Sequence, residues 1–236
     1  MTAIVPPVSP VLGPTPAPAR ALASLTPREQ LRAGRLPRRL VQLAVGLWLY
    51  GASMAMVIRG ALGLDPWDVF HAGVMTHVGL SFGTVVIAVG ALVLLLWIPL
   101  RQMPGLGTVA NVVLIGVATD VTLALLTAPD GLLARSALLV GGIVLNGLAG
   151  ALYIGAQLGP GPRDGLMTGL ARRTGRSIRL VRTSLEVSVL VVGFLLGGQV
   201  GLGTVLYAVA IGPLVQLFLP WTIVELRAAD GPTPSA

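Results

Sequence analysis

The stretch GLDPWD at residues 63–68 returns in altered form as GPGPRD at residues 159–164, and this repetition decides how the chain is organised. The two copies are separated by 96 residues, the shift that carries Pro66 onto Pro162. The same shift carries GLGTV at 105–109 onto an identical GLGTV at 201–205 without a gap. Self-similarity at a fixed offset indicates internal repeats. The sequence therefore predicts a unit that occurs twice, over 35–130 and 131–224.

The composition is that of a membrane protein. The 236-residue chain is 54 % hydrophobic and 11 % charged, with a mean hydropathy of +0.86, whereas average soluble domains carry roughly 25 % charged residues. Such a chain cannot cover a soluble core with polar surface, so we expect it in lipid. Cysteine is absent and only two histidines occur. Disulfides and thiolate metal sites are thereby excluded, and we expect no metal and no cofactor.

Six segments have the length and apolar character needed to cross a bilayer, which takes about 20 residues. The first unit supplies spans at about 40–60, 81–100 and 107–127, and the second supplies spans at about 136–156, 180–198 and 202–221. The predicted fold is an all-α membrane protein with six transmembrane helices. Each three-helix unit carries an extra short helix between its first and second spans.

The segments outside the two units are expected to be tails. Residues 1–34 contain a proline-rich stretch with no apolar core, which indicates a cytoplasmic disordered tail rather than a secretory signal. Within it Thr26, Pro27 and Glu29 predict the start of a short surface helix. Residues 225–236 are expected to form a second cytoplasmic tail.

Arginine placement predicts the orientation, because basic residues favour the cytoplasmic side of a membrane. With the N-terminus inside, fourteen of the sixteen arginines fall on the cytoplasmic side and only Arg59 and Arg135 fall outside. Both termini are therefore expected in the cytoplasm. Three spans per unit is an odd number, so the second unit would enter the membrane from the opposite side. Such inverted-topology repeats occur in many transporters and in some channels.

The polar stretch in each unit predicts a helix start. Asp65 fits the N-cap, Pro66 the first helical position and Asp68 the first turn, and Pro162 and Asp164 repeat the pattern. These helices either lie flat at the interface, with Trp67 in the aromatic belt, or dip into the bundle as half-helices. The acidic residues either only stabilise their own helix ends, or two helix N-termini meet near the midplane. There they would hold an anion, or their carboxylates would bind a cation.

Polar residues inside the spans are the other candidates for a site. Asp120 lies halfway along the third span, where a carboxylate costs ~2.5–3.5 kcal/mol to insert. We expect it to face the bundle interior or a cavity, or to be a hydrogen-bonded structural carboxyl. Glu186 either joins a site or pairs with Arg182 one turn away. No catalytic residue is predicted. The candidate substrate- or ion-binding residues are Asp68, Asp164, Asp120, Trp67, Arg163, Asn111, Gln216 and Glu186.

Two further patterns predict packing and lipid contacts. Small residues at Gly51 and Ala55, and at the matching Gly147 and Ala151, predict close helix crossing, most simply between the two units. A basic stripe ahead of the fifth span is expected to face anionic lipid headgroups. Nucleic-acid binding is not expected without interleaved aromatic residues, whereas a protein partner or a homo-oligomer stays open. The stripe consists of Arg172, Arg173, Arg176 and Arg179.

The ordered motifs resemble a bacterial family of integral membrane proteins, the YczE/YyaS/YitT group. The resemblance covers residues 35–222. It rests on RLPRRL at 35–40, GLDPWDV at 63–69, GLSFGT at 79–84, PGLGT at 104–108, GPRDG at 161–165 and GLGT at 201–204. The resemblance implies a multi-pass protein of the bacterial plasma membrane. It brings no settled activity and no catalytic residues.

These observations support two main hypotheses. The first is a small transporter or channel-like protein with a site where the two units meet. The second is a non-transporting membrane protein that binds a partner or supports envelope or biosynthetic machinery. This second hypothesis predicts surface-lying polar stretches and no cavity near the midplane. An intramembrane enzyme is less favoured, because His71 and Glu186 are expected on opposite sides and no metalloprotease, serine-hydrolase or phosphate-loop motif occurs.

Overall fold

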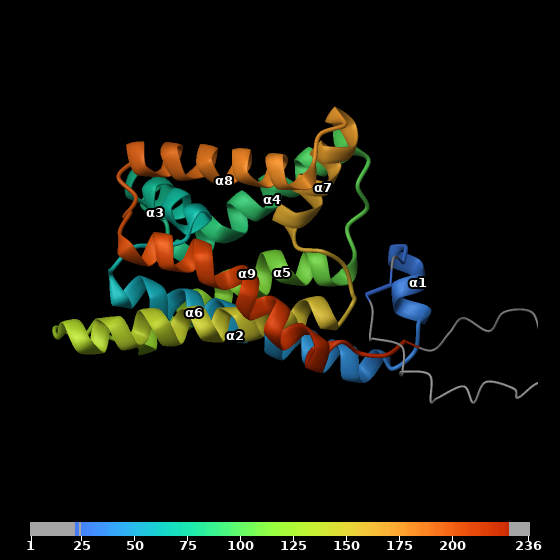
Figure 1. Ribbon diagram of the computed structural model, residues 1–236, viewed down its shortest axis with the longest axis horizontal. Helices are drawn as coiled ribbons and strands as arrows, with labels where there is room; N and C mark the ends of the chain where they lie inside the picture. Colours follow the sequence, from blue (N-terminus) through green and yellow to red (C-terminus); the bar gives the residue numbers. More distant parts are fainter. Residues whose placement is uncertain (1–21, 24, 227–236) are drawn as a thin grey trace, which may run out of the picture.

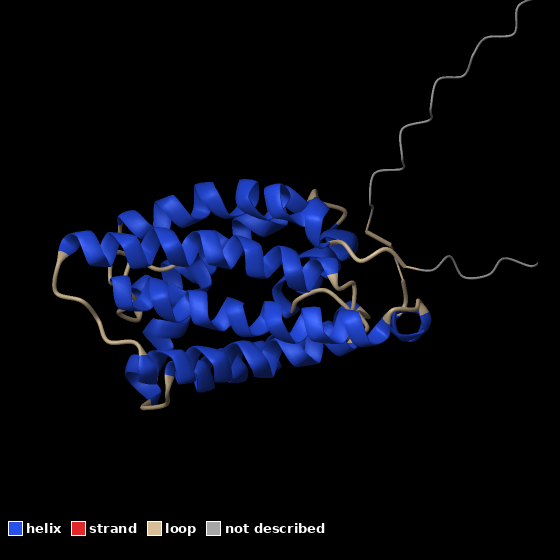
Figure 2. Cartoon of the chain, turned by 90° about the horizontal axis from the view of Figure 1, so that it is seen from below, coloured by secondary structure: helices blue, strands red, loops and turns tan. Residues whose placement is uncertain are grey.

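In the computed structural model residues 22–23 and 25–226 are described, and their regular secondary structure is helical throughout (Figures 1 and 2). The parts of the two predicted tails at 1–21, 24 and 227–236 lie outside the described residues. The helices are α1 (Pro27–Arg32), α2 (Leu36–Gly60), α3 (Pro66–Val78), α4 (Phe82–Leu100), α5 (Leu106–Leu125), α6 (Leu132–Gly155), α7 (Pro162–Thr174), α8 (Ile178–Leu195) and α9 (Leu202–Thr222).

The short helices begin where the sequence predicted. In α1 the side chain of Thr26 accepts a bond from the Glu29 amide, and Glu29 returns one to the Thr26 amide, which lowers the pKa of the Glu29 carboxyl. In α3 the Asp65 carboxylate accepts hydrogen bonds from the backbone amides of Trp67 and Asp68. Both α3 and α7 end at a glycine in the left-handed region, with φ of +65° at Gly79 and +67° at Gly175.

Five of the described helices are long and apolar enough to cross a bilayer: α2, α4, α5, α6 and α9. The sixth predicted span, at 180–198, coincides largely with α8. That helix has 18 residues and carries Arg179, Arg182 and Glu186, so its charge sets it apart from the other five. The chain is thus a membrane protein with several helices able to span, and a sixth span stays a prediction.

The helices of the two halves follow the 96-residue shift. In the first half α2, α3, α4 and α5 begin at 36, 66, 82 and 106, and in the second half α6, α7, α8 and α9 begin at 132, 162, 178 and 202. We call residues at equal places in the two halves mates. The long helices α2 and α6 lie side by side and run in opposite directions (Figure 1).

The crossing of α2 and α6 rests on mated glycines. A Cβ at Gly46 would lie 2.9 Å from the Tyr153 backbone nitrogen, and a Cβ at its mate Gly142 would lie 3.1 Å from the Ser53 carbonyl oxygen. Only glycine permits so close an approach of the two backbones. The prediction that Gly51 and Gly147 also join the two halves is wrong. These glycines face the opposite side of α2 and α6, where they pack on α5 and α9 of their own halves.

Two arginines tie each half to the end of the other. Arg39 of α2 is buried and donates to the carbonyls of Ala156 and Gln157 at 2.8 and 2.6 Å. Its mate Arg135 donates to the carbonyls of Gly60 and Ala61 at 2.9 and 2.5 Å. These carbonyls lie at the C-terminal ends of α6 and α2, which a cation stabilises. Each half therefore completes a helix end of the other.

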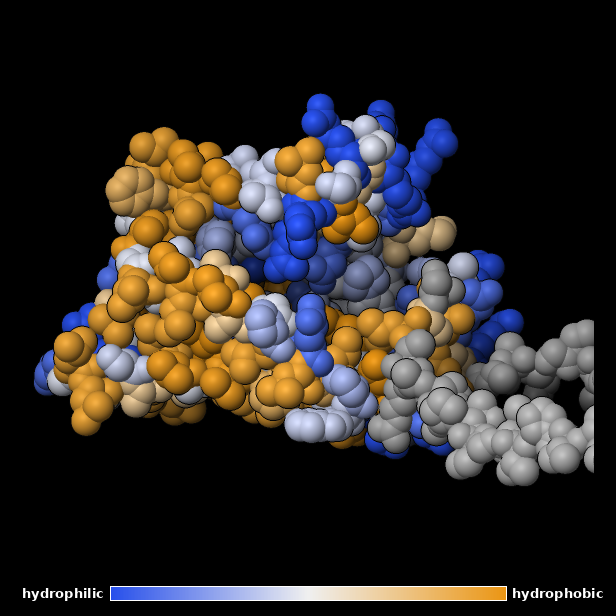
Figure 3. Space-filling model, in the orientation of Figure 1, coloured by the Kyte–Doolittle hydropathy of each residue, from blue (hydrophilic) through white to orange (hydrophobic). Residues whose placement is uncertain are grey.

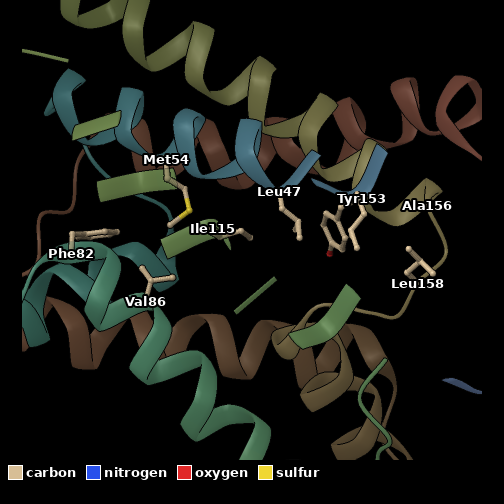
Figure 4. Packing of buried hydrophobic residues seen from close by; sticks show 9 residues of the cluster. Leu47, Met54, Phe82, Val86, Ile115, Tyr153, Ala156 and Leu158 are labelled. Atoms are coloured by element: carbon tan, nitrogen blue, oxygen red, sulfur yellow. The ribbon is translucent and has the colours of Figure 1, made fainter. Parts of the chain in front are cut away.

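The apolar core contains residues of both halves. One cluster brings together side chains from α2, α4, α5 and α6, directed toward a shared interior (Figure 4). A second cluster joins α3, α4 and α7 through Trp67, Val93, Trp97 and Leu166. Trp97 donates its indole N–H to the Pro162 carbonyl at 3.0 Å. This packing fixes the N-terminal ends of α3 and α7 inside the bundle.

Candidate functional site

A cavity of about 330 Å³ lies between the two halves. The first turns of α3 and α7 both reach it, and side chains of α2, α4, α5, α6, α8 and α9 complete its wall. Glu186 of α8 and Gln216 of α9 line it at the surface, and hydrophilic residues gather in the hollow between these two helices (Figure 3). Ligand pockets measure about 300–1,000 Å³, so this cavity has the size expected for a small ligand.

Trp67 belongs to this interior and not to a surface aromatic belt. Its side chain is packed against Val93, Trp97 and Leu166, and the residue is only 5 % exposed. The start of α3 is therefore packed inside the helix bundle. The Trp67 ring lines the cavity, while its buried Nε1–H donates to no acceptor among the described residues.

An acidic cluster lies beside Trp67 at the start of α3. Asp65 and Asp68 are 4 % and 1 % exposed. The guanidinium of Arg163, from the start of α7, approaches their Oδ1 atoms at 3.8 and 3.9 Å and lies 5.0 Å from the Trp67 ring centre. The Nδ1 of His71 lies 3.1 Å from the Asp68 carboxylate. One cation of the second half thus serves two carboxylates of the first half, stacked on an aromatic face.

The start of α7 differs from the start of α3. The mate of Asp65 is Gly161, so no side chain caps α7. Asp164 lies in the first turn, where the helix dipole favours a carboxylate. It accepts the Tyr153 hydroxyl at 2.9 Å, and it is exposed to the cavity that it lines. The ring of Tyr50 meets that of Tyr153 edge-on, with centroids 6.2 Å apart.

Each half contributes a tyrosine and an asparagine to the cavity wall, and the shift matches each of these tyrosines with the asparagine of the other half. Asn146 and Tyr207 come from α6 and α9, and the Tyr207 hydroxyl donates to the Asn146 amide oxygen at 2.8 Å. Their mates are Tyr50 and Asn111, which also line the cavity. Asn146 additionally donates to the Ser53 hydroxyl at 2.7 Å. The wall therefore presents polar groups from both halves, with the amide and the phenol exchanged.

Glu186 pairs with Arg182 at 2.9 Å within α8, and both residues line the cavity at its exposed edge. His71 and Glu186, which were expected on opposite sides of the membrane, both line this one cavity. The reason is that α8 of the second half packs against α3 of the first. Proximity alone makes no catalytic pair of them.

Asp120 lies outside the site. Its carboxylate accepts the Gly83 amide at 2.7 Å and the Ser81 hydroxyl at 2.5 Å, and so it caps α4 from the neighbouring helix α5. The hydrogen-bonded structural carboxyl is therefore the alternative that the geometry favours. The basic stripe of Arg172, Arg173, Arg176 and Arg179 lies away from the cavity on exposed positions. Of these, Arg173 donates to the Pro99 carbonyl at 2.7 Å.

The structure brings together seven of the eight candidate residues. Trp67, Asn111, Arg163, Asp164, Glu186 and Gln216 line the cavity and Asp68 lies directly behind it, whereas Asp120 does not. Sequence reasoning missed Asp65, His71 and Arg182 as wall residues, together with the three tyrosines. A signal for the tyrosines was available in the sequence. The 96-residue shift matches Tyr50 with Asn146 and Asn111 with Tyr207, so a polar side chain occupies each of these positions in both halves. In the described part of the chain, no three His, Cys, Asp or Glu side chains gather to hold a metal ion.

Comparison with known proteins gives the family. The model of a family of unknown function, DUF6198, matches residues 37–220. An uncharacterized protein of Haemophilus influenzae is 41 % identical over 177 residues, 75 % of this chain and 81 % of the relative. The uncharacterized membrane protein YczE of Bacillus subtilis is 35 % identical over 186 residues, 78 % of this chain and 86 % of the relative.

A further relative is the uncharacterized protein YyaS of Bacillus subtilis, 25 % identical over 180 residues, which cover 75 % of this chain and 90 % of the relative. No solved structure matches the chain. The resemblance found in the sequence motifs is confirmed. The chain belongs to the YczE-like family of membrane proteins, DUF6198.

Proposed function

We propose that this protein is a small transporter of the bacterial plasma membrane, with its substrate site in the cavity between the two halves. The proposed architecture has six spans in two inverted-topology repeats, and both termini in the cytoplasm. The cavity carries the proposal. Two helices that begin 96 residues apart, α3 and α7, both place their first turns at it. In secondary transporters, helix ends at the interface of inverted repeats form the substrate site.

A difference between the two halves supports transport further. In the first half α4 packs along α5, whereas in the second half α8 makes no comparable contact with α9. Inverted repeats in two different arrangements are what alternating access requires, because exchange of the two arrangements moves the opening to the other side. In the proposed orientation the closed α4–α5 contact lies toward the outside. The open α8–α9 side faces the cytoplasm.

The alternative, a non-transporting protein that binds a partner, predicted polar stretches on the surface and no internal cavity. The start of α3 is instead buried, with Asp65 and Asp68 at most 4 % exposed, and a cavity adjoins it. These observations favour a solute site over a docking role.

Disulfide trapping tests the proposed second arrangement without knowledge of the substrate. The chain has no cysteine, so introduced pairs report without background. Ser177 and Gln216 are the mates of Ser81 and Asp120, whose side chains are 2.5 Å apart in the closed contact. In membranes we expect the pair Ser177→Cys/Gln216→Cys to cross-link, as the control pair Ser81→Cys/Asp120→Cys does. Cross-linking of the control pair alone would show that the second side never closes, and would overturn transport by exchange.

Cysteine accessibility tests the orientation. Leu80 and Arg176 are mates, and both are exposed at the ends of α3 and α7. In intact cells a membrane-impermeant maleimide should label Leu80→Cys, while Arg176→Cys should react only after the membrane is opened. Labelling of both mates from the same side would contradict the inverted repeat.

A further inference from the structure

We propose that the cavity binds a small organic cation, held at Asp164 and surrounded by the aromatic rings of the wall. This inference names the substrate class of the proposed transporter and rests on that proposal. It is carried by the charges around the cavity, by the unequal treatment of two mated aspartates, and by the chemistry of the wall.

The charges around the cavity do not balance. Four carboxylates lie in or directly behind its wall, those of Asp65, Asp68, Asp164 and Glu186, against the two guanidinium groups of Arg163 and Arg182. With all of these groups ionised, two negative charges are left over. Burial and the neighbouring Asp68 raise the pKa of the Asp65 carboxyl to about 7, so the excess at neutral pH lies between one and two charges. Uncompensated charge is costly away from bulk water. A positively charged ligand is the partner that such a site favours.

The mates Asp68 and Asp164 locate the unmatched charge. Asp68 of the first half faces Arg163 of the second half at 3.9 Å. Under the 96-residue shift, the residue that corresponds to Arg163 is Trp67. The first half therefore offers Asp164 an aromatic ring where the second half offers Asp68 a cation. Asp164 is exposed to the cavity, and its hydrogen-bond partner is the neutral Tyr153 hydroxyl. The cation that Asp164 interacts with, Arg182, forms its ion pair with Glu186 instead. A ligand cation at Asp164 would complete the arrangement that the chain builds for Asp68.

The wall suits an organic cation better than a metal ion. No three carboxylate or histidine side chains in the described residues converge as metal ligands do. Four aromatic residues instead line the cavity: Tyr50, Trp67, Tyr153 and Tyr207. Aromatic faces attract alkylammonium and guanidinium groups, and Arg163 over Trp67 already shows this contact inside the protein. The unpaired indole N–H of Trp67, in a residue only 5 % exposed, adds a donor for an oxygen atom of the ligand.

Binding to the purified full-length protein in nanodiscs tests the proposal, with calorimetry as the readout. The probes are choline, its uncharged isostere 3,3-dimethylbutanol, and propionate. We expect choline to bind at least ten-fold more tightly than 3,3-dimethylbutanol, and propionate not to bind. Asp164→Asn should weaken choline binding at least ten-fold, and Glu186→Gln should weaken it less, because Arg182 already pairs with Glu186. The control Asp130→Asn, on an exposed loop, should bind as the wild type does.

Several outcomes would overturn the inference. They are equal binding of choline and its uncharged isostere, binding of propionate instead, no binding of any probe, or unchanged choline binding by a folded Asp164→Asn variant. Cross-linking of Ser177→Cys/Gln216→Cys without choline binding would remove the ligand class and leave the transporter. Choline binding lost in Asp164→Asn, without that cross-link, would leave a cation site in a protein that does not transport.

Discussion

The contact between α4 and α5 and the gap between α8 and α9 are built from mated residues, yet they differ in packing. At the first, a Cβ on Gly116 would lie 2.4 Å from the Gly83 carbonyl oxygen. At the second, a Cβ on Gly212, the mate of Gly116, would meet nothing within 4 Å. The glycine on α5 is present in both halves, whereas Gly83 on α4, which the close approach also needs, has Arg179 as its mate. The second half thus keeps one of the two glycines of the closed contact, and closure there has to accommodate the side chain of Arg179.

The side chains at these two places differ as well. Asp120 accepts the Gly83 amide and the Ser81 hydroxyl, whereas its mate Gln216 lies exposed at the edge of the cavity. A charged acceptor makes stronger hydrogen bonds than a neutral amide. The closed contact is therefore stabilised by the Asp120 carboxylate, whereas the open side has only the neutral amide of Gln216 for the same role.

The largest expected effect is the removal of that carboxylate. Asp120→Ala leaves the buried Gly83 amide, in the first turn of α4, without an acceptor and releases the Ser81 hydroxyl. An unsatisfied buried donor costs roughly 1–3 kcal/mol, and more where the lost partner is charged, so we expect a loss of about 3 kcal/mol in stability. Thermal unfolding in detergent measures it. Gln216→Ala is the matched control, with an expected change below about 0.5 kcal/mol. Equal losses in both variants would contradict the comparison.

A smaller effect is expected at the mated glycines. Gly116→Ala forces α4 and α5 apart, because the new Cβ meets a backbone oxygen that cannot turn away. Overpacking of this kind costs about 2 kcal/mol. Gly212→Ala should leave the protein equally stable or about 0.5 kcal/mol more stable, since alanine favours a helix. In the Ser177→Cys/Gln216→Cys background, however, Gly212→Ala should slow the cross-link. A destabilising Gly212→Ala would show that the second side is closed in solution.

The smallest effect is expected at the exposed ion pair of α8. Arg182 and Glu186 are 53 % and 33 % exposed, so water screens their attraction. Glu186→Gln should lower the free energy of unfolding by at most about 0.5 kcal/mol. Chemical denaturation in detergent micelles checks this value. A loss several times larger would mean that the pair fastens α8 to the rest of the bundle.

Local structure could be predicted from the sequence because its determinants are neighbours along the chain. Pro66 and Pro162 after a capping position fixed the starts of α3 and α7, and Gly79 and Gly175 fixed their ends. The repeat predicted which helices would match. The partners of Gly51 and Gly147 could not be predicted, because a small-residue pair shows that a helix crosses something closely, but not which helix.

The site was predictable only in part, for a similar reason. Asp68, Arg163 and Asp164 stand out in the motifs, whereas Tyr50, Tyr153 and Tyr207 look like ordinary residues of apolar helices. Tyr50 and Tyr153 reach the cavity because α2 and α6 cross in opposite directions, and Tyr207 reaches it because α9 packs against α6. Both are properties of tertiary packing. Asp120, in contrast, was predicted as a site residue and lies outside the site. A carboxylate in a predicted span suggests a solute site, and only the position of α4 shows that it serves a helix end.

The reciprocal bonds of Arg39 and Arg135 bear on the origin of the fold. Each arginine donates hydrogen bonds to the C-terminal end of a helix in the other half. Arg39 binds the carbonyls of residues 156 and 157, and Arg135 binds the carbonyls of their mates, residues 60 and 61. A polypeptide of half this length would leave both its arginine and its own helix end unsatisfied. Two such polypeptides packed about a two-fold axis would satisfy both at once. The two sets of bonds are related to each other as the equivalent bonds of a symmetric homodimer would be.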